Sequence, residues 1–276
     1  MPKRKLLITG AAGRIGSSFA RHAHQRYDLR LMTQPADSPE RINTIKPFGE
    51  IVTGDIRDLA RMKELSQNIH TVLHLAADPN ASSTWDVNLN TNIIGTYNTF
   101  AAARHAGCAR VVFASSIHAV SGYGKSVQVK EHDPVNPGDL YGVSKCFGES
   151  LARYMAEQEK LPSICIRIGA WLPADQMTED FAAAHLDTFI SARDLNQLIE
   201  KSIEADHLSF AILHGTSAGM FRRLDITQTM QQVGYHPQDD ASQFIPPLKA
   251  LDLASRLLAH NLVDGRQESG LRDDVT

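Results

Sequence analysis

A glycine turn near the N-terminus constrains the fold of this chain most. Residues 6–9 form a short apolar run of strand type, and three glycines spaced GxxGxxG follow, leading into the helical pattern SSFARHAHQRY. Glycine tolerates positive φ and lets the backbone approach a pyrophosphate, whose charge is favoured at the amino end of a helix. The order predicts a dinucleotide site, with a purely structural turn as the alternative. The residues expected there are Gly10, Gly13, Arg14, Ile15 and Gly16.

Strand and helix patterns then alternate along the chain. Because strands that alternate with helices build a parallel sheet covered on both faces, we expect an α/β fold, a Rossmann-type doubly wound sheet with ligands at the carboxyl ends of its strands. Helices are predicted between most of the strands, notably over residues 84–106 and 140–159. The expected strands are residues 6–9, 29–32, 51–53, 71–75, 110–114 and 163–167.

The regular alternation weakens after Gly169. Residues 170–192 have no clear period, and beyond them the pattern predicts a strand at 210–213 and helices at 193–205, 225–233 and 248–261. We therefore expect three parts: a dinucleotide-binding Rossmann domain over residues 1–169, a small C-terminal substrate-binding appendage over residues 170–262 that is interleaved with the main domain, and a polar tail over residues 263–276.

Composition excludes several classes of partner. The chain has 276 residues, 42% of them hydrophobic, and a net charge of −3, so it can bury a core and has no basic excess for nucleic acid. No apolar run approaches the ~18 residues that span a bilayer, so we expect no membrane partner and a cytoplasmic location.

The cysteines are odd in number and form no CxxC, and no HExxH occurs. We predict no metal site and no disulfide framework.

Tyr141 and Lys145 are four residues apart in a predicted helix, and therefore share one face. A free tyrosine has a pKa of about 10. Lowering this pKa by roughly three units needs about 4 kcal/mol of preferential interaction with the phenolate, which a close ammonium could supply. The pair is a candidate general base. A chance pairing on an amphipathic helix is the alternative.

Ser116 ends the strand pattern VVFASS and is a candidate to orient a substrate oxygen, or is a simple cap.

Other candidate cofactor residues stand at predicted strand ends. Asp55 and Ile56 could meet an adenine, and the small residues after His74 would let a dinucleotide lie flat. Asn92 lies within a long predicted helix, where asparagine is unfavourable, so it either bonds backbone near the site or faces solvent. The candidates of this group are Thr33, Asp55, Ile56, Leu75, Ala76, Ala77, Asn92 and Ile168.

Seven ordered motifs together resemble the extended short-chain dehydrogenase/reductase family, also called the NAD-dependent epimerase/dehydratase family. They are TGAAGRIG, GDIRD, HLAA, NIIGTYN, VVFASS, LYGVSK and RIG, and they cover about residues 5–170. Within the family, RVVFASSIHAV, IRIG and the late GYHPQDD resemble the uronate dehydrogenase-like sugar dehydrogenases. The resemblance implies oxidation of the anomeric hydroxyl of a free sugar to a lactone, with a nicotinamide cofactor.

The resemblance also implies residue roles. Tyr141 would be the base, Lys145 would lower its pKa and hold the nicotinamide ribose, and Ser116 would orient the substrate. His118 would line the sugar site. The family further implies a homodimer in which the helices predicted over residues 84–106 and 140–159 pair across a two-fold axis.

Two departures from the uronate dehydrogenase pattern concern the substrate. Ile117 stands where those enzymes have asparagine, and residues 170–192 contain no Arg or Lys to hold a carboxylate. We hypothesise that an acidic sugar, which is a uronate or a sulfonated or phosphorylated sugar, is held instead by Arg193, Arg222 or Arg223, since arginine forks suit such anions. The alternatives for these arginines are a solvated face, or ion pairs with Asp194 and Asp225.

A third departure concerns the cofactor. NAD sites usually carry an acid at the end of the second strand, whereas this chain has Met32, Thr33 and Gln34 there and no acid before Asp37. The sequence leaves NAD and NADP both open.

Two other functions also stay open: a nucleotide-sugar epimerase or dehydratase with tightly bound NAD, and a non-catalytic dinucleotide-binding protein. The intact Ser116, Tyr141 and Lys145 argue against the second of these.

Overall fold

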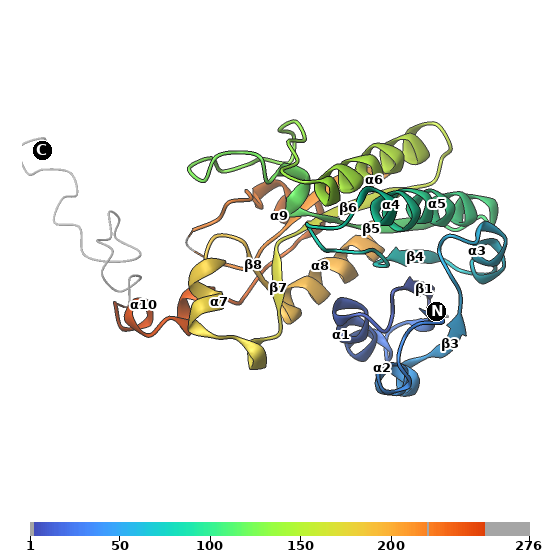
Figure 1. Cartoon of the computed structure of the whole chain (residues 1–276), viewed down its shortest axis with the longest axis horizontal. Coiled ribbons are helices and arrows are strands. Elements are labelled where there is room, and N and C mark those ends of the chain that lie inside the picture. Colours follow the sequence, from blue (N-terminus) through green and yellow to red (C-terminus); the bar gives the residue numbers. More distant parts are fainter. Residues whose placement is uncertain (1–2, 220, 252–276) are drawn as a thin grey trace, which may run out of the picture.

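A seven-stranded parallel sheet forms the centre of the molecule. The computed structural model describes residues 3–219 and 221–251 (Figure 1). Its strands follow the order β3-β2-β1-β4-β5-β6-β9, and every neighbouring pair is parallel. The strands are β1 (Lys5–Thr9), β2 (Asp28–Thr33), β3 (Glu50–Thr53), β4 (Thr71–His74), β5 (Arg110–Ser116), β6 (Ser163–Ile168) and β9 (Phe210–Gly215).

Helices cover both faces of this sheet, as the alternating pattern predicts (Figure 1). On one face lie α3 (Leu59–Leu65), α5 (Gly95–His105) and α6 (Leu140–Glu157), which pack side by side. On the other face lie α1 (Arg14–Ala23), α2 (Pro39–Ile45), α8 (Ala192–Glu204) and α9 (Thr227–Val233). The Rossmann-type doubly wound fold expected from the sequence is confirmed.

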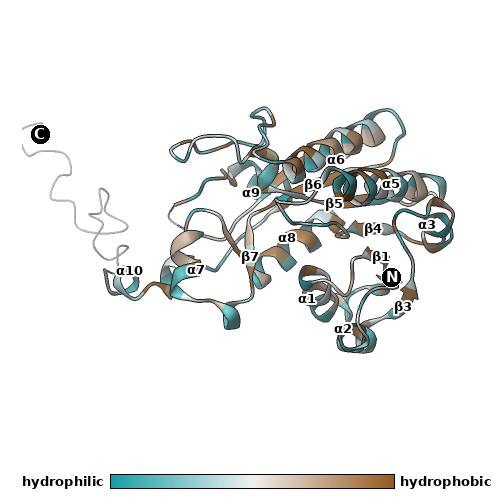
Figure 2. Cartoon of the chain, in the orientation of Figure 1, coloured by the Kyte–Doolittle hydropathy of each residue, from teal (hydrophilic) through white to brown (hydrophobic). Residues whose placement is uncertain are grey.

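The strands are hydrophobic on both faces because each face is covered. Leu6 and Ile8 pack into the core beneath α1 and α8, whereas Leu7, between them, packs into the core beneath α3, α5 and α6. Figure 2 shows hydrophobic colour on the strands and mixed colour on the helices, as expected for helices with one buried face. No helix within residues 3–219 and 221–251 is long and apolar enough to cross a membrane.

The segment without a clear period contains regular structure that the sequence did not predict. A second, two-stranded parallel sheet pairs β7 (Ala170–Leu172) with β8 (Phe189–Ser191), and the short helix α7 (Glu179–Ala184) lies between them. Such three-residue strands are too short to give a detectable hydrophobic period. The predicted helix at residues 248–261 overlaps α10 (Pro246–Leu251), and the rest of it lies outside the described residues.

The helix predicted over residues 84–106 is one helical rod with a change of winding. It begins as α4 (Trp85–Val87), passes through a wider π-helical segment at Asn88–Ile94, and continues as α5. π-Helical segments often turn side chains toward functional sites. Here the change of winding accompanies two fully buried asparagines, Asn88 and Asn92, whose side chains bond each other at 2.9 Å.

A buried ion pair joins α6 to the sheet. Arg167 on β6 donates to both carboxylate oxygens of Glu149 at 2.8 Å, and the two side chains are 1% and 3% exposed. Ser115 on β5 donates to the same carboxylate at 2.6 Å. Each charge is therefore compensated inside the core, and removal of one partner leaves the other buried alone.

We expect Glu149→Gln to lower the free energy of unfolding by about 3 kcal/mol, because it leaves the Arg167 charge uncompensated in the core. Glu157→Gln is the matched control, since Glu157 lies on the same helix and pairs with Arg153 at the surface, at 3.8 Å. The control should change stability by under about 1 kcal/mol. Urea denaturation would measure both, and equal effects of the two substitutions would contradict the assignment.

Candidate active site

The glycine turn connects β1 to α1 and passes close to the loop after β4. Gly10 has a φ of 67°, and a Cβ at this position would lie 2.9 Å from the Cα of Ala76. Gly16 has no room for a side chain either, since a Cβ there would collide with the carbonyl of Gly10. Gly13 precedes α1 as its N-cap and offers no side-chain capping bond. The turn therefore leaves backbone N–H groups of the first helical turn available to an anionic ligand.

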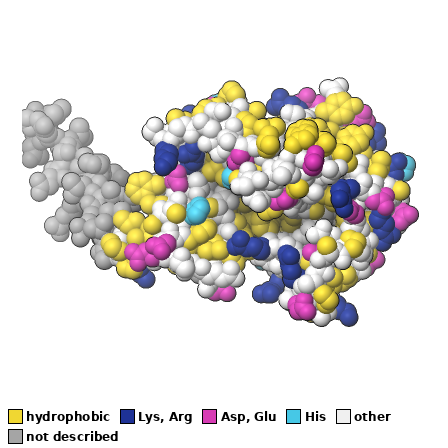
Figure 3. Space-filling view, viewed as in Figure 1, with side chains coloured by type: hydrophobic (Ala, Val, Ile, Leu, Met, Phe, Trp, Pro, Cys, Tyr) yellow, Lys and Arg dark blue, Asp and Glu magenta, His cyan; other side chains and the backbone are white. Residues whose placement is uncertain are grey.

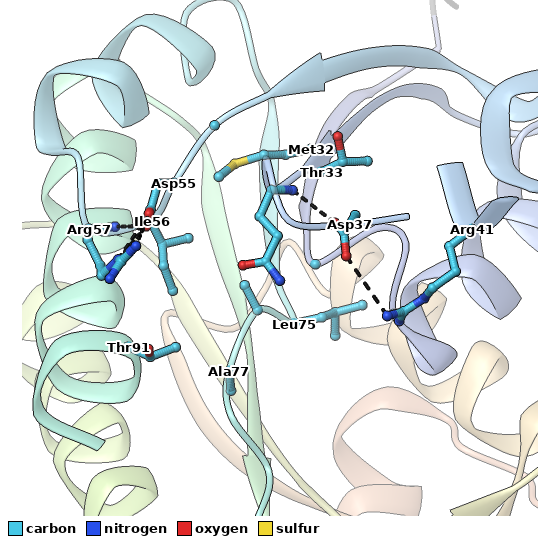
Figure 4. A pocket seen from close by; sticks show the side chains of 15 residues that line it. Met32, Thr33, Asp37, Arg41, Asp55, Ile56, Arg57, Leu75, Ala77 and Thr91 are labelled. Atoms are coloured by element: carbon cyan, nitrogen blue, oxygen red, sulfur yellow. Dashed lines mark hydrogen bonds and ion pairs between the residues drawn. The ribbon is translucent and has the colours of Figure 1, made fainter. Parts of the chain in front are cut away.

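One cavity, of about 440 Å³, lies on the outer side of this turn (Figure 4). It is bounded by the ends of β1, β2, β3 and β4, at the carboxyl edge where the strand order reverses between β1 and β4. In open α/β sheets, this switch point is where ligands bind. Of the residues predicted from the sequence, this cavity contains Gly10, Gly13, Thr33, Asp55, Ile56, Leu75, Ala76 and Ala77.

A second cavity, of about 740 Å³, continues from the first on the other side of the turn. The two share Gly10, Gly13, Arg41, Leu75 and Ala77. Figure 3 shows a hollow on this face with Lys and Arg side chains around it. Of the residues predicted from the sequence, the second cavity contains Gly10, Gly13, Arg14, Ile15, Gly16, Leu75, Ala77, Ser116, Ile117, His118, Tyr141, Lys145 and Ile168.

Tyr141 lies in the first turn of α6, which Asp139 caps by accepting from the backbone N–H of Gly142 at 2.7 Å. Its side chain is nearly buried at the wall of the cavity. Burial raises the pKa of Tyr141 to about 12, and a hydrogen bond with the Ser116 side chain acts in the opposite direction. The predicted lowering of this pKa by Lys145 is therefore wrong for the protein alone, because desolvation outweighs every favourable contact.

Lys145 is on the same face of α6 as Tyr141, as its spacing predicts. Its Nζ donates to the backbone carbonyl of Ala114 on β5 at 2.8 Å and lies 5.4 Å from the centre of the Tyr141 ring. Burial lowers the pKa of Lys145 to about 8. The ammonium is held at the floor of the cavity by β5, within reach of a ligand and of the phenol.

His118 and Asp139 form a pair next to Tyr141. The Nδ1 of His118 lies 2.6 Å from Oδ2 of Asp139, and the imidazole meets the Tyr141 ring edge-on, with 5.3 Å between their centres. The Ser116 hydroxyl accepts from the backbone N–H of His118 at 3.2 Å. Asp139 therefore caps α6 and orients His118 at the same time, which places a polar ring beside the phenol.

Asn92 bonds backbone near the site, which is the first of its two predicted alternatives. Its side-chain oxygen accepts from the N–H of Asp78 at 2.9 Å, and its amide donates to the carbonyl of Asp78 at 3.0 Å. The side chain is buried, with a residue exposure of 2%. It lines neither cavity described above. Asn92 thus fixes the loop after β4, against which both cavities form.

The three arginines predicted to hold the substrate lie elsewhere. Arg193 pairs with Asp239 at 2.5 Å, Arg222 donates to the carbonyl of Gly219 at 2.9 Å, and Arg223 donates to the carbonyls of Ser121 and Tyr123. None of the three is among the described residues that line the two cavities. The structure therefore does not bring these arginines to the two cavities, because Arg193 pairs with a carboxylate and Arg222 and Arg223 donate to backbone carbonyls.

Several residues of the larger cavity gave no detectable signal in the sequence. They come from the segment without a clear period and from α2: Arg41, Trp171, Phe181, His185 and Thr188. The His185 ring stacks on Phe181 with 4.1 Å between the ring centres. The guanidinium of Arg14, in the glycine turn, lies 5.2 Å from the centre of the Trp171 ring. The segment that follows β6 therefore contributes an aromatic wall to the larger cavity.

Of the residues that the structure describes, no three His, Cys, Asp or Glu side chains gather in a way that could hold a metal ion. Cys108, Cys146 and Cys165 are free thiols. Burial raises the pKa of Cys108 and of Cys146 to about 11. These thiols are held in the neutral form at pH 7, in which they are poor nucleophiles and metal ligands.

Sheet order, glycine turn and the position of the cavities define a Rossmann-type dinucleotide-binding protein. The chain belongs to the NAD dependent epimerase/dehydratase family, whose model matches residues 6–203. This confirms the family that the seven sequence motifs resemble.

Several proteins that are similar to this chain are named as dehydrogenases of sugars. The NAD-dependent glucose-6-phosphate dehydrogenase of Haloferax volcanii is 31% identical over 261 residues, which cover 90% of this chain and 98% of that protein. The L-arabinose 1-dehydrogenase (NAD(P)(+)) of the same organism is 31% identical and covers 87% of this chain and 99% of that protein. A mutant uronate dehydrogenase from Agrobacterium tumefaciens, solved in complex with NAD, is 30% identical with a TM-score of 0.77, over 90% of this chain and 89% of that one.

We expect the charge state of Lys145 to make stability depend on pH. Because its pKa is lowered from 10.5 to about 8 in the folded state, the unfolded chain binds one more proton between those pH values. The free energy of unfolding should therefore rise with pH across this window, by at most about 1.4 kcal/mol per pH unit.

The measurement compares wild type with Lys145→Met, since other groups also titrate in this range. Chemical denaturation at pH 8, 9 and 10 should show wild type gaining stability relative to the variant. A difference between the two proteins that is the same at every pH would contradict a lowered Lys145 pKa.

Proposed function

We propose that the protein is an NAD(P)-dependent sugar dehydrogenase that oxidises the anomeric hydroxyl of a free sugar to a lactone. The observation that carries the proposal is the meeting of Ser116, Tyr141 and Lys145 in one cavity that continues into the glycine-turn cavity. A phenol, an ammonium and a hydroxyl at the wall of a dinucleotide site suit proton removal coupled to hydride transfer. The sugar-oxidising relatives support the same reaction.

The site fits a dinucleotide by the space it leaves. The turn at Gly10 and Gly16 is a cradle that any Cβ would fill, and the loop at Ala76 and Ala77 adds small side chains opposite it. The cofactor, when bound, supplies the hydride acceptor and a positively charged nicotinamide ring. Gly13, Arg14 and Ile15 would hold its pyrophosphate, with the adenine between Ile56 and the end of β3.

Tyr141 is the proposed base. Its Oη takes the proton from the anomeric hydroxyl while Ser116 holds the same oxygen, so that the phenol and the hydroxyl orient the substrate together. Burial opposes ionisation of Tyr141, so the positive charges of Lys145 and of the bound cofactor are needed to favour the phenolate. Lys145, anchored on the carbonyl of Ala114, would hold the ribose of the cofactor.

The charge of the larger cavity as a whole supports an acidic sugar. The described residues that line the larger cavity include Arg14, Arg41, His118, Lys145 and His185, and none of those described is an Asp or Glu. A cavity lined by one sign of charge attracts the opposite sign. His118 and His185 also line this cavity, and Phe181 supplies an apolar wall beside His185.

The proposed cofactor-binding and substrate-binding parts follow each other along the chain. Residues 1–169 are the proposed cofactor-binding domain, and the region 170–262 is the proposed substrate region. Support comes from Trp171, Phe181, His185 and Thr188, all of which lie beyond Gly169 and line the larger cavity.

One assay tests the activity. The purified protein is incubated with NAD or NADP and a panel of neutral, uronic, phosphorylated and sulfonated sugars, and reduced cofactor is followed by absorbance. Reduction with an acidic sugar is the expected result. Conversion of a nucleotide-sugar without net reduction would instead identify an epimerase or dehydratase, and no turnover with any sugar would leave a dinucleotide-binding protein.

We expect Tyr141→Phe to lower kcat by about 10²- to 10⁴-fold, because the variant keeps the ring but has no oxygen to accept the proton. Cofactor affinity should change little, as judged by calorimetric titration. Ser144→Ala is the matched control, since this hydroxyl lies on the same helix and donates to the carbonyl of Tyr141 at 2.7 Å without lining the cavity. Full turnover by Tyr141→Phe would exclude the phenol as base.

A homodimer is proposed on the face formed by α5 and α6. Large hydrophobic side chains are exposed along these helices and the start of the rod, and Figure 3 shows hydrophobic side chains on the surface over α5 and α6. A second copy of the chain would cover them in a four-helix arrangement. The exposed side chains are Trp85, Val87, Ile94, Tyr97, Leu140, Val143 and Tyr154.

We expect Tyr97→Glu to convert the dimer to a monomer, because it places a charge in the middle of the face that the second copy covers. Phe221→Glu is the control, since Phe221 is about equally exposed, 52% against 50%, and lies on neither helix. Light scattering coupled to gel filtration would measure both. A monomeric wild type would refute the dimer.

A further inference from the structure

A further cavity, of about 600 Å³, lies between α1 and α8, and is called the α1–α8 cavity below. The chain after β7 completes its wall with residues of the 3-10 turn Ala174–Gln176, and Figure 1 shows this segment on the same side of the molecule as α1 and α8. Among the described lining residues, Arg14 and Trp171 also line the larger cavity, and none lines the smaller one. These two side chains therefore form the wall that the α1–α8 cavity shares with the proposed active site.

One face of α1 lines the α1–α8 cavity with polar side chains. The helical spacing that places side chains on one face joins Arg14, Ser17, Ser18 and Arg21. Both guanidinium groups are exposed, and no acid among the described residues forms an ion pair with either of them. Asp175 is the one acid among the described residues that line this cavity. The excess of positive charge attracts an anion.

Two buried polar atoms in the lining have no partner among the described residues. Asn196, on α8, is 6% exposed; its amide donates to the hydroxyl of Ser18 over a long 3.5 Å, and its Oδ1 accepts no hydrogen bond. The indole Nε1 of Trp171 is buried and donates none. Buried polar groups are normally paired, because an unpaired one has lost its bonds to water without replacement.

These two atoms have complementary chemistry. An amide oxygen accepts from a hydroxyl, and an indole N–H donates to an oxygen. The terminal torsion of an asparagine has a broad energy well, so the oxygen of Asn196 can turn toward a ligand in the cavity that its side chain lines. A ligand with both hydroxyl groups and an acceptor oxygen would pair them at once.

We propose that the α1–α8 cavity is a second ligand site, which binds a small hydroxylated carboxylate of the sugar-acid type. Arg21 binds the carboxylate, since a guanidinium donates two parallel N–H bonds to it. Asn196 and the two serines of α1 bind hydroxyl groups, and Trp171 donates to a ligand oxygen. The cavity thus recognises a charge at one end and hydroxyl groups along the rest of the ligand.

The proposed reaction supplies a reason for this ligand class, and to that extent the inference rests on the proposed function. Oxidation of a free sugar gives a lactone, which is an internal ester. Addition of water across its ester bond gives a hydroxylated carboxylic acid, which is ionised at pH 7. The product of the larger cavity therefore becomes a ligand of the kind that the α1–α8 cavity fits.

The experiment measures binding by fluorescence, without nucleotide and without any oxidisable sugar. The chain has two tryptophans, so Trp85→Phe leaves Trp171 as the reporter in the wall of the cavity. Titration of this variant with D-gluconate should give a saturable change in emission, with a Kd of about 1 mM or below. Acetate has the charge without the hydroxyl groups, and D-glucitol has the hydroxyl groups without the charge. Each should bind at least about 10-fold more weakly.

Two further substitutions in the same background locate the ligand. Arg21→Ala should weaken gluconate by about 10- to 100-fold, the value of one charge-assisted contact. Asn196→Asp keeps the shape of the side chain and adds a negative charge, so it should weaken gluconate by at least about 10-fold. Neither residue is among those described as lining the other two cavities. Arg26→Ala is the matched control, since Arg26 follows α1, pairs with Glu200 and Glu204, and lies outside the described lining of all three cavities.

The proposal predicts that the control leaves the affinity for gluconate unchanged. A gluconate response that survives both Arg21→Ala and Asn196→Asp would place the ligand in the larger cavity and overturn the second site. Absence of any response, or equal affinity for acetate or glucitol, would also overturn it. Gluconate binding that depends on Arg21, in a protein that oxidises no sugar, would reject the proposed reaction and leave the second site standing.

Discussion

The close approach between the glycine turn and the loop after β4 is the constraint on which both cavities depend. Gly10 adopts a left-handed conformation against the backbone of Ala76, at a distance that no side chain permits. This contact brings the ends of β1 and β4 together at the point where the strand order reverses, and one cavity opens on each side of it. The loop is held from its other side by Asn92, through two bonds to the backbone of Asp78.

Burial decides the electrostatics of the site. The same burial that raises the pKa of Tyr141 to about 12 lowers that of Lys145 to about 8, so each group loses part of its preference for the charged form. The pKa of Lys145 stays above 7, so its ammonium keeps its charge at neutral pH while the phenol stays protonated until a ligand brings further positive charge. In the proposed reaction, this arrangement would limit proton removal to the site with its cofactor bound.

The sequence predicted the sheet, the glycine turn and the meeting of Ser116, Tyr141 and Lys145, because each depends on local pattern or on strand ends that meet at one edge. The prediction from the sequence failed where tertiary packing decides which partner a side chain bonds. Arg193, Arg222 and Arg223 have the right chemistry for an anion, yet Arg193 and Arg223 bond partners that only the tertiary fold supplies, and Arg222 bonds the carbonyl of Gly219 three residues earlier. The predicted direction of the Tyr141 pKa shift was also wrong. The spacing of the sequence shows that a lysine is near, but it does not show how deeply the phenol is buried.

The segment after β6 shows a different limit. Its short strands and the helix α7 are too brief to give a period, and the aromatic wall that they build was therefore invisible in the chain. Residues such as Phe181 and His185 enter the cavity from a region whose local sequence favours no element. Their placement depends on the pairing of β7 with β8, which is a contact between residues some twenty positions apart.

The stacking of Arg14 on Trp171 ties these two parts of the molecule together. Arg14 is the first residue of α1 and Trp171 lies on β7, so this cation–π contact joins the end of the glycine turn to the segment after β6 at the wall of the larger cavity. A ligand that moves the Arg14 guanidinium also changes the surroundings of the Trp171 indole, and thermodynamic linkage requires that any coupling between two ligands of this cavity be equal in both directions.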